Sequence, residues 1–118
     1  MSHVTGGGIA ANLARVLPGH LAAEVDRSTW TPPPVFELIG RLGGVSRPEL
    51  ERTFNQGIGM FAAVAPDAVD ATLALLGGRG VEAWVCGAVR ERADGEHGDA
   101  EAKGGGGGAV ILRGSHPA

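Results

Sequence analysis

The chain has 118 residues, of which 21 are Gly and 7 are Pro, and a formal net charge of −3. This length allows one small domain or part of a larger one. The slightly acidic balance argues against a general nucleic-acid binder, which would carry a basic stripe. Cys86 is the single cysteine, which excludes an internal disulfide and a cysteine-based zinc site. The sequence shows no membrane-length apolar run and no signal peptide. We therefore expect a cytoplasmic protein with neither nucleic acid nor a membrane as partner.

Apolar spacing and cap residues predict the elements in chain order. Ile9, Leu13 and Val16 recur at helical spacing ahead of Pro18-Gly19, which is a helix stop signal. Ser46 and Glu49 have capping-box spacing at the start of a further helix. The predicted helices span residues 9–17, 34–42, 48–54 and 66–76. The predicted strands span residues 21–25, 58–65, 82–90 and 109–113.

Four apolar side chains, Val35, Leu38, Ile39 and Leu42, form one face of the second predicted helix. Residues 58–65 form a continuous apolar run, which favours a buried strand.

This order of elements predicts an α/β (α+β) fold, in which helices pack on a mixed sheet of about four strands. Residues 1–92 would form the packed part of the chain. Residues 93–108 are acidic and rich in glycine, which is typical of a flexible loop. Residues 109–118 would supply a final strand and a tail.

The turn Thr5-Gly6-Gly7-Gly8 is the most informative local pattern. Glycines accept positive φ and allow close approach to the main chain. The following helix N-terminus would favour an anion such as phosphate. The pattern is neither a Walker loop nor a dinucleotide fingerprint. The alternative is that these glycines only make a tight turn. Asn12, one to two turns into the helix, is a weaker candidate contact.

Asn55 is a weaker candidate still, because it would serve equally well in capping the preceding helix. The histidines are not paired at ligand spacing, and only His3 adjoins the glycine turn, while His97 and His116 fall in the predicted loop and tail. Carboxylates such as Glu51 are expected at helix starts or on solvated faces, so we predict no metal site. Cys86 is expected to be an inert core residue, and no residue stands out as a catalytic group.

Several runs of the sequence, taken together, resemble the AIR synthetase family, the phosphoribosylformylglycinamidine cyclo-ligases of purine biosynthesis. They cover about residues 3 to 90 in the expected order. These runs are His3-Val4-Thr5-Gly6-Gly7-Gly8, Asn12, Arg15-Val16-Leu17-Pro18, Arg52-Thr53-Phe54-Asn55-Gln56-Gly57-Ile58-Gly59-Met60, Ala83-Trp84-Val85 and Gly87-Ala88-Val89.

The resemblance implies an ATP-driven ring closure that converts formylglycinamidine ribonucleotide into aminoimidazole ribonucleotide, ADP and phosphate. ATP would activate the formyl amide oxygen, and the amidine nitrogen would then attack the activated carbon. The resemblance also implies that this chain is the latter part of a C-terminal domain. An N-terminal domain outside the chain would hold most of the ATP and Mg²⁺ and would form a homodimer. The chain alone is then expected to be inactive.

Two other functions remain open at this stage. One is another ATP-using relative in the same superfamily, such as selenophosphate synthetase or thiamine-monophosphate kinase. The other is a non-catalytic α/β module that binds a small anion and regulates a partner.

Overall fold

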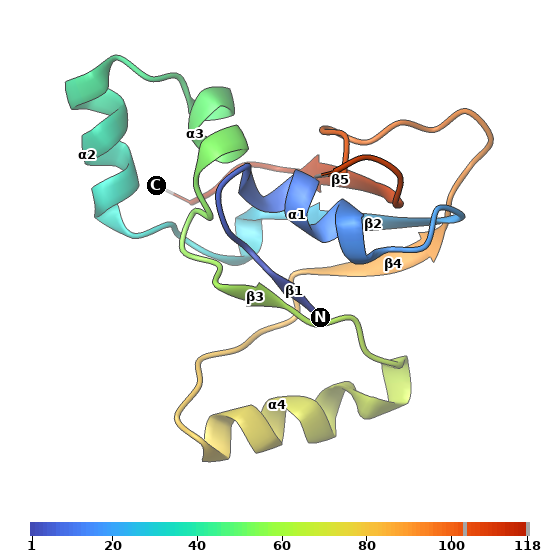
Figure 1. The fold of residues 1–118 in the computed structure, drawn as a ribbon. Coiled ribbons are helices and arrows are strands. Elements are labelled where there is room, and N and C mark those ends of the chain that lie inside the picture. The colour runs from blue at the N-terminus through green and yellow to red at the C-terminus, as the bar shows by residue number, and fades with distance from the viewer. Residues whose placement is uncertain (103, 118) are drawn as a thin grey trace.

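The structure is a computed structural model that describes residues 1–102 and 104–117. The helices in this part of the chain are α1 (Gly8–Val16), α2 (Pro34–Gly43), α3 (Arg47–Thr53) and α4 (Val69–Gly78). The strands are β1 (Ser2–His3), β2 (Leu21–Asp26), β3 (Met60–Phe61), β4 (Gly87–Glu91) and β5 (Ala109–Arg113). Two 3₁₀ turns, η1 (Arg27–Thr29) and η2 (Pro66–Ala68), follow β2 and precede α4. The predicted α+β class is confirmed (Figure 1).

A mixed sheet with strand order β4-β2-β5 forms the centre of the fold. β2 pairs antiparallel with β4, placing Ala23 opposite Val89, and parallel with β5, placing Ala23 opposite Val110. The prediction of a mixed sheet is therefore correct, although this sheet has three strands instead of about four. The short strands β1 and β3 form a separate antiparallel pair, and the sequence analysis did not foresee β1.

Helix α1 covers one face of the mixed sheet (Figure 1). Ile9 and Leu13, which supplied the helical spacing in the sequence, are buried against Val25 and Val110 in one core cluster. Removing such side chains from water is the main favourable contribution to folding. The core therefore fixes α1, and with it the glycine turn that precedes the helix.

The strand predicted over residues 58–65 is much shorter in the structure. Only Met60 and Phe61 pair, with the two residues of β1. Ala62–Ala65 are exposed. An apolar run favours a strand only where a partner strand lies beside it, and β1 offers just two residues for pairing. The prediction of a buried eight-residue strand is therefore wrong.

The strand predicted over residues 82–90 is shifted toward the C-terminus. Pairing begins at Gly87, opposite Val25. The Asp26 N–H still donates to the Cys86 carbonyl at 2.7 Å, and β2 then turns into η1, which ends the pairing. A Cβ at Gly87 would overlap the Glu24 carbonyl, so glycine permits this close approach. Trp84 lies outside the strand and packs near Trp30, with ring centroids 6.2 Å apart.

Two helices lie at the margin of the structure, and both carry exposed apolar residues. α2 starts at Pro34 and is capped by Gly44 in the left-handed conformation, as the sequence predicts. However, no residue of α2 is buried, and Leu42 of its predicted apolar face is 80% exposed. α4 likewise buries no residue, and Leu75 is 61% exposed. None of the helices in the described residues has the length and apolar character needed to cross a membrane.

The acidic, glycine-rich segment makes several defined contacts with the rest of the chain. Ala102 is buried in the core cluster, and the Asp99 N–H donates to the Val110 carbonyl at 2.8 Å. The guanidinium of Arg90 donates two hydrogen bonds to the carboxylate of Glu96, at 2.7 and 2.8 Å. Flexibility over residues 93–108 stays a prediction. Lys103 in this segment and Ala118 in the predicted tail lie outside the described residues.

Candidate functional site

The glycine turn enters α1 through two residues with positive φ. Gly7 is the N-cap, with φ 101° and ψ −7°, and Gly8 follows with φ 83°. Side chains with a Cβ rarely adopt this conformation, so the turn requires glycine here, as expected. Gly7 supplies no side-chain acceptor to the first turn of the helix. The amides of that turn therefore lack a side-chain cap.

Asn12 holds this turn in shape from inside the protein. Its side-chain nitrogen lies 3.2 Å from the Thr5 carbonyl oxygen, 3.3 Å from that of Gly6 and 2.7 Å from that of Gly8. The Thr5 hydroxyl donates to Asn12 Oδ1 at 3.3 Å. Asn12 is fully buried, so its amide acts on the turn and does not face solvent.

Gly8 brings α3 against the turn. A Cβ on Gly8 would overlap the carbonyl oxygen of Glu51, so the two helices touch at this residue. The close approach places the side chains of Glu51 and Arg52 beside the start of α1.

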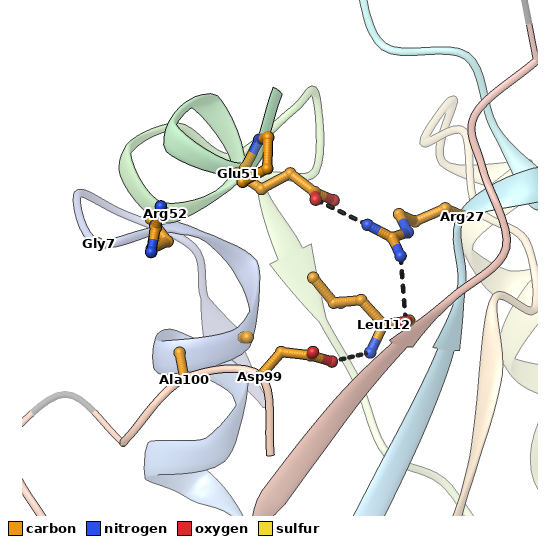
Figure 2. A pocket seen from close by; sticks show the side chains of 9 residues that line it. Gly7, Arg27, Glu51, Arg52, Asp99, Ala100 and Leu112 are labelled. Atoms are coloured by element: carbon orange, nitrogen blue, oxygen red, sulfur yellow. Dashed lines mark hydrogen bonds and ion pairs between the residues drawn. The ribbon is translucent and has the colours of Figure 1, made fainter. Parts of the chain in front are cut away.

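A small pocket of about 120 Å³ lies next to the glycine turn (Figure 2). It is bounded by the start of α1, by α3, by β5 and by the segment before β5. The residues that line it are Gly7, Ala10, Arg27, Pro48, Glu51, Arg52, Asp99, Ala100 and Leu112.

Arg27 and Asp99 are fixed by bonds across the pocket wall (Figure 2). Arg27 Nη1 donates to Glu51 Oε1 at 2.7 Å, and Nη2 donates to the Leu112 carbonyl at 3.1 Å. The Leu112 N–H donates to Asp99 Oδ2 at 2.6 Å. One oxygen of each lining carboxylate is thus engaged, and the Arg27 guanidinium, paired with Glu51, lies in the pocket wall close to a helix start without a side-chain cap.

Asp26 anchors the turn that carries Arg27. Its carboxylate accepts hydrogen bonds from the hydroxyl and the backbone N–H of Ser28, at 2.6 and 2.9 Å. These bonds, the hydroxyl first, lower the pKa of Asp26. An ionised Asp26 therefore holds η1 in place at the edge of the pocket.

The structure brings most of the sequence candidates together. Thr5, Gly6, Gly7, Gly8 and Asn12 form one unit at the start of α1. Gly7 is the member of this unit that lines the pocket.

The remaining candidates lie apart from this unit. Asn55 belongs to a different turn, in which its Oδ1 accepts from the Gly57 N–H at 2.9 Å, and it does not line the pocket. His3 is exposed on β1. Cys86 packs against the core, and burial raises the pKa of its thiol, which fits the inert role expected for it.

Three pocket residues were not anticipated as parts of a site. Glu51 was expected at a helix start or on a solvated face, but its side chain is only 15% exposed and pairs with Arg27. Arg27 and Asp99 are held at the pocket by hydrogen bonds to residues far away in the sequence, Glu51 for Arg27 and Leu112 for Asp99. Only Arg27 has a sequence signal that points to the pocket, because it is a charged residue directly after the buried strand β2.

Comparison with known proteins gives consistent matches. Residues 1–99 match the family model described as AIR synthase related protein, C-terminal domain. A Streptomyces fradiae protein named "Putative phosphoribosylformylglycinamidine cyclo-ligase" is 59% identical over 102 residues, covering 86% of this chain and 56% of that protein.

Two further relatives come from other bacteria, and their names do not contain the word "Putative". The phosphoribosylformylglycinamidine cyclo-ligases of Chromobacterium violaceum and Neisseria gonorrhoeae are 46% and 42% identical over 97 residues. These matches cover 82% of this chain and 28% of each relative. The chain thus spans about half the length of the first relative and about a quarter of the other two.

Proposed function

The chain belongs to the family of AIR synthase related proteins through their C-terminal domain, and on that premise we propose that it is the anion-binding C-terminal part of a phosphoribosylformylglycinamidine cyclo-ligase. The observation that carries the proposal is the sequence match to curated cyclo-ligases, together with the family match over residues 1–99, which include the glycine turn. The whole enzyme would close the imidazole ring of formylglycinamidine ribonucleotide, with ATP as the phosphate donor.

The proposed role of this chain rests on the pocket beside the glycine turn. The first turn of α1 directs backbone N–H groups and the positive end of the helix dipole toward its start. Arg27 lines the same pocket, and Arg52 adds a second guanidinium. Together these groups favour a phosphate of a nucleotide substrate over a neutral ligand.

The two lining carboxylates do not form a ready magnesium site. Each is already held through one oxygen, Glu51 by Arg27 and Asp99 by the Leu112 N–H. Within residues 1–102 and 104–117, no three His, Cys, Asp or Glu side chains lie together as a metal site. We therefore assign Mg²⁺ and ATP to a part of the enzyme outside this chain. We assign its homodimer contact to that part as well, and we place the enzyme in the cytoplasm.

The pocket would act by binding and orienting its substrate. The residues that line it include two arginines and two engaged carboxylates, but no serine, threonine, cysteine or histidine. A ring closure driven by phosphorylation of the substrate needs a held phosphate and a fixed geometry more than a protein nucleophile. The curated relatives, which are named as cyclo-ligases, favour this proposal over a regulatory module or another ATP-using relative.

A chimaera tests the proposal directly. The segment of the C. violaceum enzyme that matches this chain would be replaced by this chain, and ring closure would be assayed with ATP and Mg²⁺. We expect turnover, and we expect Gly7→Val to lower kcat/KM more than tenfold. The melting temperature should also fall, because any residue with a Cβ in the left-handed region costs about 1–2 kcal/mol and a β-branched residue costs more.

Gly80→Val is the matched control, since Gly80 also has a positive φ, 76°, and a Cβ there meets no atom within 4 Å. A folded chimaera without turnover would overturn the proposed function. Equal kcat/KM values for the two glycine variants would mean that the glycine turn has only a structural role.

A further inference from the structure

His116 folds back from the tail onto η1 and Trp30. Its imidazole ring packs edge-on against the Trp30 ring, with centroids 4.7 Å apart. Nδ1 lies 3.0 Å from the Arg27 carbonyl oxygen and 3.3 Å from that of Trp30. The side chain is only 12% exposed. His116 was predicted to lie in a tail, and none of these contacts was predicted from the sequence.

The neighbours of the ring fix its tautomer. Both groups beside Nδ1 are carbonyl oxygens, which only accept hydrogen bonds, so Nδ1 must carry a proton. In the neutral ring, Nε2 would then present a lone pair. Nε2 faces Glu51 Oε2 at 4.0 Å, and both atoms are buried without a hydrogen-bond partner among the described residues. A proton on Nε2 would turn this unfavourable pair into an attractive ion pair across 4.0 Å.

Glu51 connects this ring to the pocket. Its other oxygen, Oε1, accepts from Arg27 Nη1 at 2.7 Å. Among the described residues, the charged side chain nearest to this ring is that of Glu51, from α3. The next is that of Arg27, from η1, which forms an ion pair with Glu51. Both line the pocket. The contacts therefore run from His116 through Glu51 to Arg27.

We propose that His116 is a positioning residue of the anion pocket, and that its Nε2 proton fixes Glu51 and thereby Arg27. The inference rests on the proposed anion-binding role of that pocket. The four charged side chains that line it, Arg27, Arg52, Glu51 and Asp99, sum to zero. Protonation of His116 adds one positive charge behind this wall. Anion affinity should therefore be higher when the His116 ring is protonated than when it is neutral.

Sulfate is the probe, because its charge stays constant over this range whereas that of phosphate changes. Binding to the full chain would be followed by NMR at pH 6 and pH 8. We expect the wild type to bind sulfate roughly fivefold more tightly at pH 6, as one added charge near a surface predicts. His116→Gln should lose this pH dependence, whereas His97→Gln should keep it, because His97 is an exposed histidine on the segment before β5.

Two spectroscopic signals test the positioning role without a variant. The ring nitrogen shifts of His116 should show the Nδ1–H tautomer in the neutral state. The Arg27 Nε–H resonance should follow the titration of the His116 ring. These signals also decide the inference if His116→Gln fails to fold.

The outcomes separate this inference from the proposed function. Sulfate binding whose pH dependence survives His116→Gln would overturn the inference alone. If sulfate does not bind at all, the anion pocket of the proposed function fails. The positioning role of His116 is then tested by the two NMR signals alone, the Arg27 Nε–H resonance and the His116 ring nitrogen shifts. An Nε2–H tautomer, or an Arg27 resonance that ignores the ring titration, would overturn it, and the opposite results would support it.

Discussion

Asn12 shows how much of the glycine turn depends on one buried amide. Its side chain contacts the carbonyl oxygens of Thr5, Gly6 and Gly8 from a fully buried position. We predict that Asn12→Leu, which keeps a similar volume, lowers the free energy of unfolding by about 2–4 kcal/mol. The loss arises because the substitution removes the amide that donates to the buried Gly8 carbonyl and to the partly buried carbonyls of Thr5 and Gly6. Urea unfolding followed by tryptophan fluorescence would measure it.

The control for this prediction is Asn55→Leu, which removes a single bond to the Gly57 N–H from a partly exposed turn. A smaller loss, about 1 kcal/mol, is expected there. Equal losses in the two variants would mean that the network of Asn12 adds nothing beyond one ordinary hydrogen bond.

Gly8 and Gly6 lie in the same turn but differ sharply in the room around them. A Cβ on Gly8 would overlap the backbone of Glu51, whereas a Cβ on Gly6 meets no atom within 4 Å. Gly8→Ala should therefore push α3 away from α1 and cost roughly 3 kcal/mol or more. Gly6→Ala should cost less than 1 kcal/mol. Thermal melts would measure both variants, and equal melting temperatures for Gly8→Ala and Gly6→Ala would contradict the prediction.

Residue-level features were predictable from the sequence where they are local. Positive φ at Gly7 follows from the composition of the turn. The burial of Glu51 and the packing of His116 were not predictable. Each depends on a partner far along the chain, Arg27 in both cases, and no local pattern encodes which distant segment will lie beside a helix.

At the scale of elements, the helices were predicted well because their ends have chemical signals. Ser46 caps α3 by accepting from the Glu49 N–H, and Gly44 ends α2. Strands were predicted less well. Residues 58–65 and 82–90 have suitable side chains, but strand length is set by the partner, and β1 and β2 end early. A strand is therefore a property of two segments, of which the sequence pattern describes one.

The acidic segment offers a test at this scale. We predict rapid amide exchange over most of residues 93–102 and 104–108, because few apolar side chains are available for burial and ordering glycines is costly. The exceptions should be the amides that donate to backbone carbonyls, which are those of Glu96, Asp99, Gly105 and Gly108. Hydrogen exchange measured by NMR would show whether the protection is confined to such residues. Uniform strong protection would refute the predicted flexibility.

The contact between Arg90 and Glu96 predicts how this segment responds to acid. The Arg90 guanidinium, with a smaller effect of the Ala93 N–H, lowers the pKa of Glu96 from 4.5 to about 2. A lowered pKa in the folded state means that this contact stabilises the protein above pH 4.5. The contribution is lost as the pH falls from 4.5 toward 2.

Melting temperatures measured from pH 6 down to pH 2 would check this dependence. Glu96→Gln should melt below the wild type at pH 6, and the gap should close as the pH approaches 2. Glu82→Gln, at an exposed position before β4, serves as the control and should follow the wild type. A gap that stayed constant with pH would argue against the ion pair as its cause.

For the whole molecule, we predict that the 118-residue chain has no cyclo-ligase activity by itself. Its pocket presents guanidinium and backbone N–H groups, but the two lining carboxylates are engaged by other groups. Magnesium bound through phosphates still needs one or two available carboxylates. The purified chain would be assayed for ATP-dependent imidazole formation with Mg²⁺ present. Turnover near that of a full-length relative would contradict both this prediction and our placement of the ATP site.

The position of β2 in the mixed sheet has a consequence for how the chain folds as it is synthesised. β2 is the central strand, yet both of its neighbours come much later in the sequence, since Ala22 pairs with Arg90 and with Ala109. Non-local pairing of this kind closes long loops and is slow. On the ribosome, Leu21–Asp26 would emerge well before either neighbour exists, and its backbone groups would stay open to other chains. A nascent chain stalled before Ala109 would therefore be a target for chaperones or for aggregation, whereas release of the last strand would complete the sheet in one step.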